Sequence, residues 1–196
     1  MTRLVRCWRR PLLIAAALLV AAAVALPVWG LTLVSTQYPD GLRMVVYPSH
    51  IQGDIAELNT LNHYIGMTPI SDGLFVELRL LPAAFGLLAL ACLAAAFVRR
   101  WWASAVPLVL MAAVAGYGFW SMTRRLYQFG HDLDPTAPIR IAPFTPPMLG
   151  TNQIAQFATY SYFSWGTFLP IVAGVLVTLV LVADLRTGRA LGRYAG

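Results

Sequence analysis

The sequence of 196 residues is 59% hydrophobic and only 11% charged, and a water-soluble domain of this size cannot bury so much apolar surface in one core. Its net charge of +6 comes from fourteen basic residues that are all arginine, and we interpret this excess as a sign of membrane topology and not of nucleic-acid binding. We therefore predict an all-α integral membrane protein with four transmembrane helices, in contact with the lipid bilayer and with no nucleic acid.

The first predicted span follows a basic leader. Residues 1–10 hold four arginines. Residues 11–34 then carry no charge, over more than the roughly 20 residues that a helix needs to cross the hydrocarbon core. A cleaved signal peptide is the alternative interpretation of this start. The apolar run is long for a signal peptide and no clean small-x-small cleavage site closes it, which favours a retained span.

The first loop, residues 35–79, is much more polar and contains one predicted short helix. Asp54, followed three residues later by Glu57, has the spacing of a capping box, and Gly66 suits the left-handed backbone that ends a helix. We therefore expect a helix between Gly53 and Gly66, with its apolar side against the spans or in the membrane interface.

Two residues at the end of this helix are candidate metal ligands. His63 and Met67 are four positions apart, so their side chains project to the same side of a continuous helix. Imidazole and thioether groups both suit Cu(I). The alternative is that His63 forms an ordinary hydrogen bond and that Met67 packs, which is the commoner role of both residue types. His50, four residues before Asp54, is expected to cap or pair with that residue.

Two further spans form a hairpin with a short turn. Residues 80–98 are apolar and end at Arg99 and Arg100, and residues 101–122 form the next apolar run. The pattern predicts two antiparallel helices with the arginine pair between them, on the same side of the membrane as the leader.

The second loop, residues 123–162, holds the remaining candidate residues. His131 lies beside the acidic residues Asp132 and Asp134, and the proline-rich segment behind them ends at Met148. Such a segment is expected to be extended and to become ordered by docking on something. The predicted metal site is shared between the two loops and has four ligands: His63, Met67, His131 and Met148.

The fourth predicted span covers residues 163–183, and a polar tail of residues 184–196 follows it. The leader, the hairpin turn and the tail together hold nine arginines and one acid, whereas the two loops hold five arginines and seven acids. The positive-inside rule places the arginine-rich side in the cytoplasm. We therefore expect a multi-pass protein of the bacterial cytoplasmic membrane, with both termini in the cytoplasm and two ordered extracytoplasmic loops.

The central turns of the four predicted spans contain no ionisable side chain. A proton relay or an ion pathway needs such groups at depth, and a transmembrane bis-His haem needs two facing histidines. Neither is expected. The sequence also has no Walker-type or glycine-rich dinucleotide motif, so no nucleotide is expected as a ligand.

Two segments resemble a known group of proteins. They are residues 61–67, Leu-Asn-His-Tyr-Ile-Gly-Met, and residues 144–151, Phe-Thr-Pro-Pro-Met-Leu-Gly-Thr. Both are similar to segments of small bacterial four-span membrane proteins associated with copper handling and with the cassettes that mature nitrous oxide reductase. The resemblance implies a role in metal delivery or in assembling an extracytoplasmic metalloenzyme, with His63 and Met67 at the matching positions.

Three functions compete. The first is a non-enzymatic accessory protein whose outer loops bind or deliver a metal, copper being favoured. The second is a structural or assembly subunit of a larger complex, with no metal of its own and with another membrane or extracytoplasmic protein as its partner. The third is an enzyme that uses His131 with Asp132 or Asp134 as acid and base, but the sequence offers no nucleophile or second cluster to complete such a site.

Overall fold

The computed structural model describes residues 2–71, 73, 76–98, 100–154 and 157–192 of the chain. The predictions that concern Met1, Asp72, Arg99 and residues 193–196 lie outside these residues.

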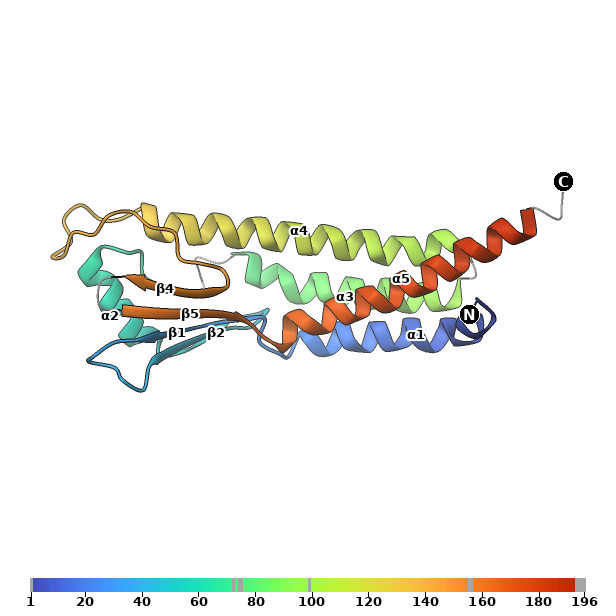
Figure 1. Ribbon diagram of the computed structural model, residues 1–196, viewed down its shortest axis with the longest axis horizontal. Helices are drawn as coiled ribbons and strands as arrows, with labels where there is room; N and C mark the ends of the chain where they lie inside the picture. Colours follow the sequence, from blue (N-terminus) through green and yellow to red (C-terminus); the bar gives the residue numbers. More distant parts are fainter. Residues whose placement is uncertain (1, 72, 74–75, 99, 155–156, 193–196) are drawn as a thin grey trace.

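Four helices form an elongated bundle, with a small sheet at one of its ends (Figure 1). Their bounds are Thr2–Ala23 for α1, Val76–Phe97 for α3, Trp101–His131 for α4 and Trp165–Gly192 for α5. Successive helices run in opposite directions, so α1 begins and α5 ends at the end of the bundle away from the sheet. Three of the helices, α3, α4 and α5, are long and apolar enough to cross a membrane.

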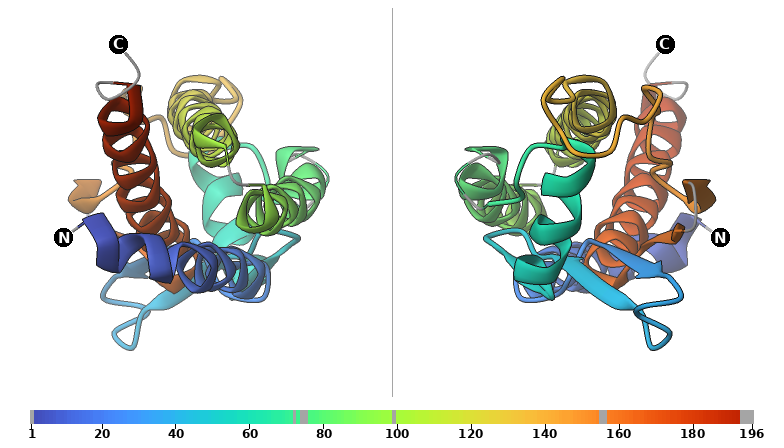
Figure 2. Two further views of the ribbon diagram at one scale, coloured as in Figure 1. Left: turned by 90° about the vertical axis from the view of Figure 1, so that its right-hand side faces the viewer. Right: turned by 90° about the vertical axis from the view of Figure 1, so that its left-hand side faces the viewer.

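The first predicted span, residues 11–34, is only partly helical. α1 ends at Ala23, and Trp29–Val34 forms strand β1. The apolar run continues through the break, and for this reason composition alone did not reveal where the helix ends. Figure 2 shows α1 lying between α3 and α5, and its side chains Leu13 and Val20 are completely buried there.

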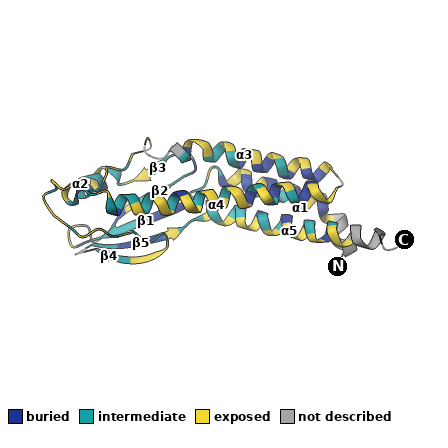
Figure 3. Ribbon diagram, turned by 90° about the horizontal axis from the view of Figure 1, so that it is seen from above, coloured by how far each residue is buried: buried dark blue, intermediate teal, exposed yellow. Residues whose placement is uncertain are grey.

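α4 is longer than its predicted span. It continues beyond residue 122 to His131, so the first part of the predicted second loop is helical and projects beside the sheet (Figure 1). Figure 3 shows that buried positions are concentrated on α1 and on the sides of α3 and α5 that face it, whereas α4 carries mostly exposed and intermediate positions. The apolar outer surface of α4 is therefore open to its surroundings.

A five-stranded antiparallel sheet unites the two loops, and the all-α prediction did not include it. Its strand order is β3 (Ile51–Gly53), β2 (Leu42–Val46), β1 (Trp29–Val34), β5 (Phe157–Phe163) and β4 (Gly150–Ile154). The central strand β1 comes from the end of the predicted first span, and it pairs on one side with β2 of the first loop and on the other with β5 of the second, which places Gly30 opposite Tyr162. The two predicted loops therefore belong to one domain at this end of the bundle. It consists of the five strands, α2 and the segments that connect them, and we call it the outer domain.

The sheet has one covered face and one open face. Side chains alternate between the faces along each strand, and on β5 the exposed residues are Tyr160 and Tyr162. On the opposite face, Leu42 is buried, and helix α2 (Ile55–Ile65) packs there against β2 with Leu58 buried. The open face is thus the one that carries the two tyrosines.

α2 lies within the predicted helix, but it begins differently from the prediction. Asp54 makes no side-chain capping bond to the helix. Its Oδ2 instead accepts a hydrogen bond from the backbone N–H of Arg43, 2.8 Å away. The carboxylate that resembled a capping residue therefore links α2 to the sheet.

Candidate functional site

The two candidate ligands at the end of α2 do not share a helical face. The helix ends at Ile65, and Gly66 has the left-handed backbone, with φ of 76°. The N–H of Met67 donates to the carbonyl of Asn62, 2.9 Å away, as in a Schellman motif. The chain leaves the helix at Gly66, so the four-residue spacing of His63 and Met67 does not align their side chains as it would in a continuous helix.

The other two predicted ligands are His131, whose ring has a partner, and Met148, whose backbone has one. The ring of His131 stacks on Tyr127, with ring centroids 3.8 Å apart, and its Nδ1 lies 3.0 Å from the Tyr127 carbonyl oxygen. The carbonyl of Met148 accepts a hydrogen bond of 2.7 Å from Trp29 Nε1, which fixes the backbone of the second loop to strand β1. The four-ligand metal site therefore stays a prediction.

His50 also differs from its expected role. Its ring stacks on Tyr47, with centroids 4.8 Å apart. Its two ring nitrogens lie 2.8 Å from Ser49 Oγ and 2.8 Å from Gln52 Nε2. The partners of His50 are thus in its own turn, and Asp54 is bound elsewhere.

The two loops meet at the end of α2. The N–H of Asp134 donates to the carbonyl of Gly66 at 2.8 Å, and the N–H of Ile139 donates to the carbonyl of Tyr64 at 3.0 Å. Gly66 is required at this contact, because a Cβ on it would overlap the backbone of Asp134 and its positive φ disfavours other residues.

Asp134 contacts both loops. Its backbone N–H binds Gly66 of the first loop, and its carboxylate binds Thr136 of the second. Hydrogen bonds from the side chain and the backbone of Thr136 lower the pKa of Asp134, and nearby His63 lowers it further. A histidine of the first loop therefore acts electrostatically on an acid of the second. Across the described ranges, however, no group of three or more His, Cys, Asp or Glu side chains could hold a metal ion.

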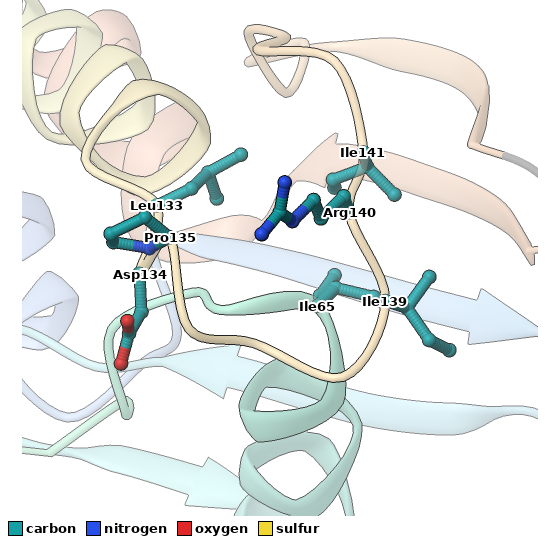
Figure 4. Close-up of a pocket in the computed structure, with 7 residues that line it drawn as sticks. All are labelled: Ile65, Leu133, Asp134, Pro135, Ile139, Arg140 and Ile141. Atoms are coloured by element: carbon teal, nitrogen blue, oxygen red, sulfur yellow. The ribbon is translucent and has the colours of Figure 1, made fainter.

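A hollow of about 250 Å³ lies where the two loops meet (Figure 4). Its apolar lining comes from the last residue of α2 and from the segment after α4: Ile65, Leu133, Pro135, Ile139 and Ile141. Two charged residues, Asp134 and Arg140, complete the lining. The hollow is partly open, and its polar and apolar surfaces are of similar size, so it offers contacts both to an apolar group and to a charged one.

A polar cluster at the other end of the bundle was not predicted. Arg9, which is only 8% exposed, donates hydrogen bonds to Asp184 Oδ2 at 3.2 Å and Ser104 Oγ at 3.2 Å. It also donates to the carbonyls of Ala95 at 2.9 Å and Val98 at 2.8 Å. One side chain of α1 therefore binds α3, α4 and α5 together.

Helical spacing was the signal that could have revealed this cluster. Arg9 precedes the buried residues Leu13, Ala16 and Val20 of α1 at intervals of three and four, so it continues their face of the helix. Its neighbour Arg10 is exposed. Both arginines contribute equally to the net charge. They differ in the side of the helix on which they lie, because Arg9 shares the face of the buried residues and Arg10 does not.

A second polar cluster lies at the sheet end of α3 and α4. Glu77 Oε1 accepts hydrogen bonds from Ser121 Oγ at 3.0 Å and from Arg125 Nη2 at 3.2 Å. The guanidinium of Arg124 lies 5.5 Å from the ring centre of Trp120, within the range of a cation–π contact. Both clusters hold helices together, and neither has the arrangement of a catalytic site.

The comparisons with known proteins found no relative. No family model, no curated protein and no solved structure matches the chain. The resemblance of residues 61–67 and 144–151 to a family of four-span proteins therefore stays a prediction, and the function must be argued from geometry.

Proposed function

We propose that this protein is a non-enzymatic, four-span accessory protein of the bacterial cytoplasmic membrane, and that its outer domain docks another membrane or extracytoplasmic protein. In this role it is a structural or assembly subunit of a larger complex. The observation that carries the proposal is the sheet, which is built from both loops, is fixed to the bundle, and keeps one face open.

Exposed tryptophans support the placement in a bilayer. Trp8 and Trp101 are more than half exposed at the end of the bundle away from the sheet, and Trp120 and Trp165 are more than half exposed near the sheet. Tryptophan is enriched at both membrane interfaces. Between Trp101 and Trp120, α4 rises about 28 Å. This rise is close to the hydrocarbon thickness of about 30 Å.

The fourth span of the proposal is α1. Its apolar helical part, Pro11 to Ala23, rises only about 20 Å, but it is packed between two helices that are long enough to cross. The apolar segment 24–28 then continues to the sheet. The exposed residues Arg10, Arg100 and Arg186 gather at the end where α1 begins, and this placement supports cytoplasmic termini.

The outer domain is fixed to the bundle by backbone contacts. At the junction between α1 and β1, the carbonyl of Pro27 accepts from the N–H of Gly166 at 2.8 Å. The carbonyl of Val28 accepts from the N–H of Ser164 at 3.0 Å and from Thr167 Oγ1 at 2.7 Å. A partner bound to the sheet would therefore be held in a defined position relative to the helices.

The open face of the sheet has the composition of a docking surface. Tyr160 and Tyr162 share this face with Arg43. In the register of the sheet, Thr32 of β1 lies opposite Arg43 on one side and opposite Tyr160 on the other. Tyrosine and arginine are enriched among residues that dominate binding energy. The ring of Tyr162 lies over Gly30, where a Cβ would overlap it, so this side chain packs directly on the backbone of β1.

Purification at native expression levels in mild detergent tests the proposal. We expect a complex with a second protein, and we expect Tyr160→Asp to lose it, because this change replaces an exposed aromatic ring of the open face by a charged group. The matched control is Gln37→Asp, which adds the same charge at an exposed position of the β1–β2 turn and should leave the complex intact. A wild-type protein that purifies alone, or a complex unaffected by Tyr160→Asp, would contradict the proposal.

Metal delivery by the outer loops is the second candidate function. The observation in its favour is the electrostatic effect of His63 on Asp134, at the place where backbone hydrogen bonds join the two loops. Mass spectrometry of bound metals would then find near-stoichiometric copper in the wild type and none in His63→Ala/Met67→Ala. The docking function instead predicts that this double variant keeps its complex, whatever its metal content.

A further inference from the structure

The hollow at the end of α2 has preformed walls. Two backbone hydrogen bonds, from the N–H groups of Asp134 and Ile139, join the segment after α4 to the end of α2. Within this segment, the N–H of Ala137 donates to the carbonyl of Asp134 at 3.2 Å and forms a turn. Walls that are already ordered lose little conformational freedom when a ligand enters, and this favours binding.

The two charged residues of the hollow differ in how they are engaged. Asp134 Oδ1 accepts hydrogen bonds from Thr136 N at 2.8 Å and Thr136 Oγ1 at 2.6 Å, and its carboxylate points out of the hollow (Figure 4). Arg140 forms no hydrogen bond or ion pair with any residue that the structure describes. Its guanidinium extends across the hollow toward Leu133 and Pro135.

We propose that this hollow binds the carboxy-terminal residue of a partner protein, with the terminal carboxylate on Arg140 and an aliphatic side chain against the apolar lining. A guanidinium binds a carboxylate through two parallel hydrogen bonds. Within a protein chain, only the carboxy-terminal residue carries a main-chain carboxylate and an apolar side chain on the same Cα. The volume of about 250 Å³ is below the usual range for whole ligands and cofactors, so it suits one residue.

This inference rests on the proposed docking function, because it identifies the part of the partner that the outer domain recognises. The positive charge of Arg140 selects for the anionic end of the peptide, and Leu133 and Pro135, which lie across the hollow from it, select for its side chain. Neutralising the carboxylate as an amide should therefore weaken binding as strongly as removing the guanidinium.

The test uses the full-length protein in lipid nanodiscs and a short fluorescent peptide that ends in leucine, compared with the same peptide as its terminal amide. By fluorescence polarisation, we expect the free acid to bind about tenfold or more tightly than the amide, since a charged hydrogen-bonded pair is lost. Arg140→Gln should abolish this preference. The matched control is Arg79→Gln, which removes an exposed arginine on α3 and should preserve the preference.

A second variant tests the apolar wall of the hollow. Loss or retention of the complex with the partner protein distinguishes a failure of this inference from a failure of the docking function. Leu133→Ser, in the wall toward which Arg140 extends, should weaken binding of the leucine peptide more than binding of a glycine-ended peptide. Equal binding of acid and amide, no binding at millimolar peptide, or a preference that survives Arg140→Gln would overturn the inference. If the complex is then still lost in Tyr160→Asp, the docking function stands without the hollow.

Discussion

The two ends of the helix bundle hold the same kind of charge pair in different surroundings. At the end away from the sheet, which we call the inner end, Arg9 and Asp184 are 3.2 Å apart, and their side chains are 9% and 19% exposed. At the sheet end, Arg125 and Glu77 are also 3.2 Å apart, but their side chains are 32% and 21% exposed. Equal distances do not imply equal contributions to stability, because water weakens the more exposed pair.

The number of partners separates the two pairs further. Arg9 also donates to carbonyls at the end of α3, where the last turn of a helix leaves carbonyls without internal partners and carries partial negative charge. Ser104 Oγ donates to Asp184 Oδ2 at 2.8 Å. At the sheet end, Glu77 accepts hydrogen bonds from the side chains of Ser121 and Arg125, which both belong to α4. The inner cluster therefore fixes all four helices, whereas the outer one fixes a hairpin.

The largest expected effect follows from removing the inner arginine. Arg9→Met leaves Asp184 without its counter-ion and the α3 carbonyls without a donor, and we expect a loss of about 3 to 5 kcal/mol in the free energy of unfolding. Unfolding by SDS in mixed micelles measures it. Arg10→Met is the matched control, because Arg10 is exposed, and it should change stability by less than about 0.5 kcal/mol.

A double variant separates the ion pair from the helix cap. Arg9→Met/Asp184→Leu removes the stranded carboxylate and should recover part of the loss. Recovery stays incomplete because the carbonyls of Ala95 and Val98 still lack their donor. Wild-type stability in the double variant would show that capping of α3 by Arg9 contributes nothing.

A smaller effect is expected at the sheet end. Glu77→Gln keeps a side chain that can bind Ser121 and loses only the charge, so we expect a loss of less than about 1 kcal/mol. Salt sharpens the comparison. In 0.5 M NaCl, screening should remove most of the Glu77→Gln effect and little of the Arg9→Met effect. A loss at Glu77 as large as the one at Arg9 would mean that burial does not distinguish the two clusters.

The parts of the fold that sequence could predict are those that depend on composition alone. Residues 80–98 and 101–122 are uninterrupted apolar runs with charge between them, and the structure has α3 end at Phe97 and α4 begin at Trp101. The sheet was missed because the apolar residues of β1 continue those of α1. On β5, the alternation of Tyr160 and Tyr162 with the small residue Ser161 was a strand signal of period two that length alone does not show.

The candidate site was harder to predict because it depends on contacts between distant segments. The pairing of His63 with Met67 assumed a helix that in fact stops at Gly66. The approach of Asp134 to Gly66 and of Arg140 to the hollow depends on how the second loop folds back on α2. No local pattern records such a contact, whereas Arg9 at least kept the helical spacing of its buried neighbours.

The smallest expected effect concerns the exposed outer domain and leaves the fold unchanged. Thr136→Val removes the Oγ1 donor to Asp134 and keeps the backbone donor, so the pKa of Asp134 should rise toward its ordinary value of 3.8 without reaching it. A carboxyl whose pKa is lowered by folding stabilises the protein above that ordinary value and loses this contribution as the pH falls through the lower one. Carboxyl chemical shifts in an NMR titration below pH 6 would measure the change. If the pKa does not move, the hydrogen bond from Thr136 Oγ1 does not set it, and the backbone N–H of Thr136 becomes the main cause.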